Sequence, residues 1–253
     1  MHKLVDTVVS FFEANTPPLG TIFALGPVFL AWAVACLAVA GWLKRDFRWR
    51  TGYTRKLFHI LIFGTAALLE WQWGTPMVCL FGGMTTLVIG YAIVRGRGNL
   101  MYEAMARESD EPHRTYFIVA PYFATLMGGL AGNMVFGSTA LIGYLVAGLG
   151  DAIGEPIGVR FGKHRYRVPS MRGVSATRSV EGSAAVFLVC SLAGVLGVWL
   201  CPTLAFTTTS FAFLAIFGII CALLEAVSPH GWDNLSMQFV PTWLAVLLFG
   251  YTT

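Results

Sequence analysis

The chain has 253 residues, of which 56% are hydrophobic and 12% are charged, and its formal net charge is +4. So few charged residues leave too little polar surface to solvate a compact soluble protein of this length. The composition therefore excludes an ordinary water-soluble domain. It predicts an all-α fold, a polytopic bundle of transmembrane helices that forms a single integral membrane domain over residues 1–253.

The first 19 residues differ from the rest of the chain. They carry Asp6 and Glu13, and they lack the basic start and cleavage pattern of a secretory signal. The segment ends near Pro17-Pro18. We expect residues 1–19 to form an amphipathic segment that lies on the membrane surface.

Long apolar runs follow, each bounded by Pro, Gly or charge. Their lengths are close to the ~20 residues that cross ~30 Å of hydrocarbon. The predicted spans are 21–43, 57–73, 76–94, 116–134, 137–150, 184–200, 204–224 and 238–252. About eight spans fit these runs best. Counts of about seven or nine stay open, because the stretch 116–150 is glycine-rich and has no charged break.

The loops between these spans hold nearly all of the positive charge. Every Lys and Arg except Lys3 falls within 44–56, 95–114 or 160–178. If the chain crosses the membrane as predicted, these loops and the 225–237 loop share one side, which the positive-inside rule makes cytoplasmic. Individual arginines near the ends of spans could instead serve only to orient the chain during membrane insertion. That alternative does not account for the acidic residues and glycines beside them.

The densest polar motif runs from Gly150 to Lys163. A continuous helix would place Asp151, Gly154, Glu155, Gly158 and Gly162 on one stripe. Carboxylates one turn apart are oxygen ligands suited to Mg²⁺, so Asp151 and Glu155 are candidate metal ligands. The alternative is a stripe of small residues that lets two membrane helices approach closely. Packing alone leaves two acidic residues at membrane depth unexplained.

A cationic and polar stretch follows and ends where the next span begins. Lys163 opens a group of basic residues that suits phosphate or lipid headgroups. Ser179 or Thr177 is a candidate cap for the next helix. Free backbone amides at the same helix start also bind anions, and Arg178 adds positive charge there. Glu181 is a candidate second metal ligand or a base for a hydroxyl group.

Two weaker clusters face the same side. Arg55 and His59 lie one helical turn apart at the start of a span, and Lys56 follows Arg55. This arrangement fits a phosphate or lipid-headgroup site, and it also fits a hydrogen-bonded packing histidine. The second cluster combines carboxylates and an amide around a Pro-Gly turn, where Asp and Asn are also ordinary turn residues: Glu225, Asp233 and Asn234.

These residues together resemble the phytol kinase and dolichol kinase family of membrane lipid-alcohol kinases, relatives of the phosphatidate cytidylyltransferases. The likeness rests on four blocks in matching order, of which the middle two are specific when taken together. The blocks are Arg55-Lys56-x-x-His59, Gly150-Asp151-Ala152 through Phe161-Gly162-Lys163, Arg178-Ser179-x-Glu181-Gly182-Ser183, and Glu225 with Asp233-Asn234.

The resemblance implies transfer of the terminal phosphate of a nucleotide, CTP in several branches, to an isoprenoid alcohol or to diacylglycerol, with a divalent metal such as Mg²⁺. It also implies that Asp151 and Glu181 form the nucleotide and metal site, that Lys163 and Arg178 contact phosphates, and that His59 lies near the acceptor. The role of Glu155 as a metal ligand comes from the residues alone. Further candidate nucleotide or phosphate contacts are Arg55, Lys56, Gly154, Gly158, Gly162, Ser179, Gly182 and Ser183.

We therefore expect residues 151–183 to form a cytoplasmic nucleotide- and metal-binding loop. The expected partners are a lipid alcohol, a nucleoside triphosphate and the bilayer, with no nucleic acid. One alternative is a phosphatidate cytidylyltransferase-like enzyme that forms a CDP-lipid. Others are a transporter and a non-catalytic structural subunit. Against transport, the sequence has no internal repeat, and its charges lie at the membrane rim rather than in mid-span.

Overall fold

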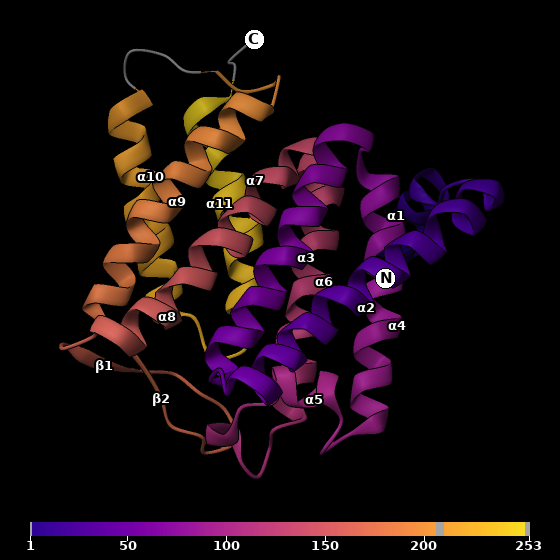
Figure 1. Cartoon of the computed structure of the whole chain (residues 1–253). Coiled ribbons are helices and arrows are strands. Elements are labelled where there is room, and N and C mark those ends of the chain that lie inside the picture. Colours follow the sequence, from indigo (N-terminus) through magenta and orange to yellow (C-terminus); the bar gives the residue numbers. More distant parts are fainter. Residues whose placement is uncertain (1, 206–209, 251–253) are drawn as a thin grey trace.

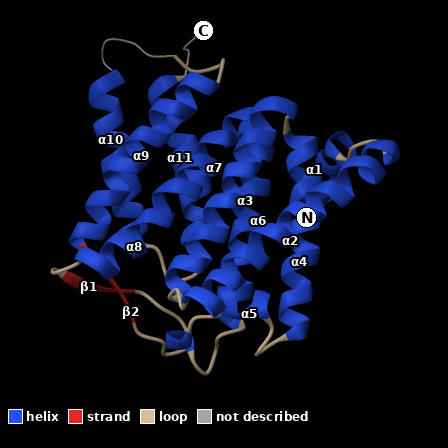
Figure 2. Ribbon diagram, viewed as in Figure 1, coloured by secondary structure: helices blue, strands red, loops and turns tan. Residues whose placement is uncertain are grey.

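A computed structural model describes residues 2–205 and 210–250. Within these residues the chain is almost entirely helical, so the predicted all-α fold is confirmed (Figure 2). The longer helices are α1 (His2–Asn15), α2 (Leu19–Phe47), α3 (Thr51–Trp73), α4 (Thr75–Arg95), α6 (Tyr116–Phe136), α8 (Ala152–Phe161), α9 (Val180–Leu200), α10 (Ser210–Val227) and α11 (Asp233–Phe249). The short elements are α5 (Leu100–Met105), η1 (Glu108–Asp110), η2 (Gly137–Ala140), α7 (Leu141–Leu145), η3 (Val146–Asp151), β1 (Arg165–Val168) and β2 (Ala176–Ser179).

Several helices are long and apolar enough to cross a membrane. Over the described residues, four segments meet this standard: α2, α4, the helical run Tyr116–Phe161 and α9. Ala212–Val227 is a shorter apolar helix. The predicted spans at 57–73 and 238–252 fall on α3 and α11, although 251–252 lie outside the described residues, as do 206–209 of the span at 204–224. The number of membrane crossings stays a prediction.

The run from Tyr116 to Phe161 reverses direction at Gly137. This glycine has a φ of 55°, a backbone conformation that residues with a β-carbon adopt rarely. After the reversal α7 returns along α6, and a β-carbon on Gly132 would lie 3.5 Å from that of Ala140. The run therefore forms two antiparallel segments, as expected from the separate spans predicted at 116–134 and 137–150.

Helix α3 lies between two apolar cores. One core joins α3 to α7, α9, α10 and α11, and the other joins α3 to α2, α4 and α5 (Figure 1). Phe63 belongs to the first and Phe58 to the second. Burial on both sides fixes α3, and with it the polar residues of its first turns.

Glycines let α8 and α9 pack closely. A β-carbon on Gly182 would lie 2.7 Å from the carbonyl oxygen of Gly154, and one on Gly158 would lie 2.9 Å from Oγ of Ser179. Such distances leave no room for a larger residue without movement. The glycine stripe thus packs two helices, the alternative given for it above, and it still leaves the neighbouring carboxylates to be explained.

The polar connections gather at one end of the bundle. Figure 1 shows α5 and the β1–β2 hairpin at the same end, below the helices. The hairpin is antiparallel and pairs Arg165 with Ser179 and Val168 with Ala176. The segment 151–183, expected to be a loop, is therefore a helix followed by a hairpin. The last residue of each strand, Val168 in β1 and Ser179 in β2, is buried. Strands of this length are too short for sequence periodicity to reveal.

Candidate active site

A cavity of about 260 Å³ lies at the polar end of the bundle. We call it the polar cavity. Its walls come from α3, the loop around η1, the end of η3 with α8, both hairpin strands, the start of α9 and the stretch from the end of α10 to the start of α11. The ionisable residues that line it are Arg55, Lys56, Arg107, Asp110, Asp151, Glu155, Arg165, Arg178, Glu225, His230 and Asp233.

Lys56 and Asp151 form a buried ion pair at the base of this cavity. Nζ of Lys56 lies 2.7 Å from Oδ2 of Asp151, and the two side chains are 8% and 3% exposed. Nε2 of His59 lies 3.5 Å from the same oxygen and 2.9 Å from the carbonyl oxygen of Ala147. That carbonyl belongs to η3, a π-helical turn that leads into Asp151. Turns of this kind occur often at functional sites.

Glu155 is held by two arginines from different parts of the chain. Its Oε2 accepts a hydrogen bond from Nη2 of Arg55 at 3.0 Å, and its Oε1 accepts one from Nη1 of Arg107 at 2.9 Å. A carboxylate with two guanidinium partners is already neutralised. Glu155 therefore organises the two arginines, and they in turn line the cavity.

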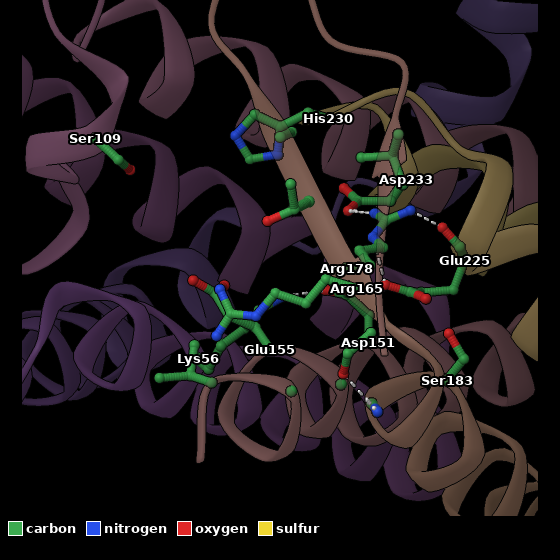
Figure 3. Close-up of a pocket in the computed structure, with 18 of the residues that line it drawn as sticks. Lys56, Ser109, Asp151, Glu155, Arg165, Arg178, Ser183, Glu225, His230 and Asp233 are labelled. Atoms are coloured by element: carbon green, nitrogen blue, oxygen red, sulfur yellow. Dashed lines mark hydrogen bonds and ion pairs between the residues drawn. The ribbon is translucent and has the colours of Figure 1, made fainter. Parts of the chain in front are cut away.

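Arg178 bridges the far wall of the cavity. Its Nε lies 2.6 Å from Oε1 of Glu225, and its Nη2 lies 2.9 Å from Oδ2 of Asp233. Nη1 also donates to the backbone carbonyls of Glu225 and Ser228. Figure 3 shows Arg178 between the two acidic side chains. This planar side chain ties β2 to the end of α10 and the start of α11.

A third network was not foreseen from the sequence. Nη2 of Arg107 donates to Nε2 of His230 at 2.7 Å, and Nε of Arg107 donates to Asp110 at 3.3 Å. An arginine can only donate, so Nε2 of His230 is unprotonated in this pair. Burial, with the positive charges of Arg107 and Arg55, lowers the pKa of His230, although Asp110 acts in the opposite direction.

Asp110 completes this network. Burial disfavours its charged form, but His230 and the charge of Arg107 outweigh burial and hold the pKa of Asp110 below its ordinary value. Arg107 and Asp110 stand in the second basic loop, and His230 is 123 residues from Arg107. The run of acids at 108–111 beside Arg107 was the available signal, but no sequence pattern connects it to His230.

The other residues singled out in the sequence divide between the cavity wall and its surroundings. Gly154, Gly158, Ser179, Gly182 and Ser183 line the polar cavity. Ser179 also caps α9, because its Oγ accepts a hydrogen bond from the amide of Gly182 at 3.0 Å. The capping alternative thus describes this serine correctly.

Glu181 does not line the polar cavity, and neither do Gly162 and Lys163. Oε1 of Glu181 lies 2.8 Å from Nδ1 of His164, and the backbone amide of His164 donates to the same carboxylate. Glu181 therefore joins the start of α9 to the residue before β1. The structure does not bring it beside Asp151.

A second cavity, of about 90 Å³, adjoins the first. We call it the junction cavity. It shares Arg55, Lys56, Asp151 and Asp233 with the polar cavity. The rest of its lining comes from α3, α4, α5, α6 and α11 and is mostly apolar; it also includes His59 and Asn234. One wall, built around Lys56 and Asp151, thus separates a charged space from an apolar one.

The described residues contain no group of three or more His, Cys, Asp or Glu side chains placed to hold a metal ion. Magnesium commonly binds through one or two carboxylates together with substrate phosphates and water. Asp151, Glu225 and Asp233 offer carboxylates to one cavity. The donor set therefore fits a metal ion that is shared with a polyphosphate and does not fit a complete protein cage.

Comparisons with known proteins give two similar sequences. The chain is 30% identical over 233 residues to the phytol kinase of a Synechocystis species, and this alignment covers 89% of this chain and 91% of that protein. It is also 38% identical over 111 residues to the dolichol kinase sec59 of Schizosaccharomyces pombe, covering 42% of this chain and 18% of that protein. No protein-family model matches the sequence, and no solved structure is significantly similar.

Proposed function

Because the chain belongs to the phytol kinase and dolichol kinase family, we propose that it is a membrane-embedded kinase that phosphorylates a lipid alcohol. The observation that carries this proposal is the wall shared by the polar and junction cavities. Lys56 and Asp151 face both spaces. A polyphosphate on the charged side and an alcohol on the apolar side would therefore meet at these two residues.

The charges of the polar cavity suit phosphoryl transfer. This reaction depends on positioning and on neutralising phosphate charge, more than on covalent catalysis by the protein. Arg55, Lys56, Arg107, Arg165 and Arg178 line one space, and guanidinium groups bind phosphate oxygens in a planar, paired fashion. In the proposed complex, phosphate oxygens replace some of the carboxylate partners that these cations now have.

The chemical step follows from the shared wall. The alcohol oxygen forms a bond to the terminal phosphorus, while the bond from phosphorus to the nucleoside diphosphate oxygen breaks. The proton of the alcohol passes to the carboxylate of Asp151, which the buried ammonium of Lys56 keeps in its charged form. His59, in the junction cavity, positions the acceptor hydroxyl.

We further propose that Mg²⁺ accompanies the nucleotide. Glu225 and Asp233 would hold the ion from the protein side; a bound ion would neutralise the charge that develops on the transferred phosphate. Glu155 organises Arg55 and Arg107 in this account, and Glu181 positions the residues before β1. CTP is the donor proposed from the family resemblance, and phytol or a related prenol is the proposed acceptor. The positive-inside rule, applied to the basic loops, supports a reaction at the cytoplasmic face.

A product assay tests the proposal. Protein purified in detergent would be incubated with each of the four nucleoside triphosphates and with phytol, other prenols, diacylglycerol and a phosphatidate in turn. Mass spectrometry of the lipids should detect a phosphorylated alcohol. A CDP-lipid, formed from a lipid phosphate and CTP, would instead establish the cytidylyltransferase alternative. If no lipid gains phosphate under any combination, the kinase proposal fails.

A further inference from the structure

We propose that the hydrocarbon tail of the lipid alcohol lies in a third cavity, enclosed by α3, α4, α6 and the N-terminal helix α1. This cavity has a volume of about 380 Å³, and we call it the apolar cavity. The inference rests on the proposed kinase function for the identity of its ligand. It adds the place where the apolar part of that ligand binds and the residues that limit its length.

The apolar cavity continues the junction cavity. The two share Ile62, Phe63, Thr85, Tyr122 and Thr125. The junction cavity in turn shares its polar wall with the polar cavity. The three cavities therefore adjoin one another in a row, which we call the path, from the charged site at Lys56 and Asp151 into the interior of the bundle.

The lining of the apolar cavity suits a hydrocarbon chain. None of the described residues that line it is charged. Phe81 and Leu126 contribute apolar walls from α4 and α6, and α1 adds the apolar side chains of Phe11 and Phe12. A nucleotide, an ion or a charged headgroup would lose its hydration here without a charged partner. A hydrocarbon chain loses nothing comparable and gains from leaving water.

The path extends along about three turns of α4. On α4 the lining residues run from Ile89, in the junction cavity, to Val78, in the apolar cavity. Eleven residues of helix correspond to about 16 Å along its axis. The path thus leads from the polar end well into the depth that the membrane's hydrocarbon would occupy.

Thr85 gives independent support for a ligand on this path. It lines both the junction and the apolar cavity, and its side chain is 2% exposed. Its hydroxyl oxygen has no hydrogen-bond partner among the described residues. A buried hydroxyl without a partner is unfavourable, so a ligand oxygen that passes this point would find a hydrogen-bonding group there.

Two glycines of α4 supply a direct test. Gly82 lines the apolar cavity, and an added β-carbon at that position would have no atom within 4 Å. Gly90 of the same helix is equally free of neighbours, but it lines none of these three cavities. Leucine at position 82 would therefore occupy the proposed tail site, and leucine at position 90 is its matched control.

The first measurement is chain-length selectivity. For each variant, kcat/KM would be measured with a ten-carbon and a twenty-carbon prenol. We expect Gly82→Leu to lower the ratio of kcat/KM for the twenty-carbon prenol to kcat/KM for the ten-carbon prenol at least tenfold. Gly90→Leu should leave this ratio at the wild-type value. Equal ratios in Gly82→Leu and wild type, with both proteins folded, would overturn the assignment of the cavity to the tail.

The second measurement does not need catalysis. A twenty-carbon prenol with a photoreactive diazirine at its tail end would be bound to the wild-type protein, irradiated and mapped by peptide mass spectrometry. Labels on residues that line the apolar cavity are expected, in 78–86 of α4, in 122–133 of α6, in 62–66 of α3 or at 11–12 of α1. Labels confined to residues outside this lining would refute the tail site. If the cavity is labelled but no alcohol is ever phosphorylated, the tail site stands and the kinase proposal falls.

Discussion

Nζ of Lys56 and Oδ2 of Asp151 lie 2.7 Å apart, with side chains 8% and 3% exposed, although 95 residues separate them in sequence. Two opposite charges buried this deeply depend on each other. Removing one partner leaves the other charge without compensation, whereas replacing both with apolar residues of similar volume is often tolerated. This pair therefore allows stability and chemistry to be separated by mutation.

The first prediction concerns stability. Asp151→Leu alone should destabilise the protein by about 3–5 kcal/mol, because Lys56 would remain buried and unpaired. The double variant Lys56→Met/Asp151→Leu should unfold near the wild-type temperature. Thermal unfolding of the detergent-solubilised proteins, followed by intrinsic tryptophan fluorescence, checks both. A double variant no more stable than the single one would contradict the interdependence of the pair.

Arg178 should not tolerate replacement by lysine. A single ammonium group cannot keep both Glu225 and Asp233 as partners together with two backbone carbonyls, as the guanidinium does. We expect Arg178→Lys to reduce kcat/KM for the nucleotide at least tenfold. Arg167→Lys, at an exposed position in β1 of the same hairpin, is the control and should keep wild-type kinetics. Comparable losses in both variants would indicate a general effect of the hairpin.

Substitution of Glu181 tests whether this residue is a metal ligand or a positioning residue. Its carboxylate contacts the ring and the backbone amide of His164, outside the polar cavity. Gln keeps an oxygen that accepts these hydrogen bonds but binds Mg²⁺ poorly. We predict that Glu181→Gln keeps kcat/KM within about threefold of wild type and the same dependence on Mg²⁺ concentration, because it retains the contact. A much higher Mg²⁺ requirement in this variant would place Glu181 among the metal ligands.

Because His230 is buried, we predict that the folding stability of the protein depends on pH. Burial lowers its pKa in the folded protein, while the unfolded chain has an ordinary value of about 6.5. As the pH falls below that value, the unfolded state takes up a proton that the folded state does not. Stability should therefore decrease with falling pH by up to about 1.4 kcal/mol per pH unit.

The variant His230→Gln removes this proton uptake and keeps an oxygen that accepts a hydrogen bond from Arg107. Its melting temperature should change less between pH 7 and pH 5.5 than that of the wild type. If the melting temperature of His230→Gln changes with pH as much as that of the wild type, His230 is not the titrating group in this range.

The sequence was informative where one helix carries the whole pattern. Helical spacing predicted one stripe of Asp151, Gly154, Glu155, Gly158 and Gly162. The first four line the polar cavity, and Gly162, just past the end of α8, does not. The first turns of α3 likewise carry Arg55 and Lys56, which line both the polar and the junction cavity, and His59, which lines the junction cavity. Such predictions need only the period of a helix.

Other features depend on distant contacts, which a single sequence does not encode in any readable spacing. The partners of Glu155 are Arg55 and Arg107, from two other segments. Glu181 contacts His164, 17 residues before it in the chain, and not the polar cavity. For the same reason the path to the apolar cavity appears only when α3, α4 and α6 are assembled.

The most direct test of the account is transfer of a labelled phosphate to phytol by the double variant Lys56→Met/Asp151→Leu. Wild-type protein, given a nucleoside triphosphate labelled at its terminal phosphate, should produce labelled phytyl phosphate. The double variant, shown to be folded by its unfolding temperature, should transfer label at least about 100-fold more slowly, a loss typical of removing groups that act in the transition state. A folded double variant that phosphorylates phytol at a rate near that of the wild type would contradict the placement of the reaction at Lys56 and Asp151.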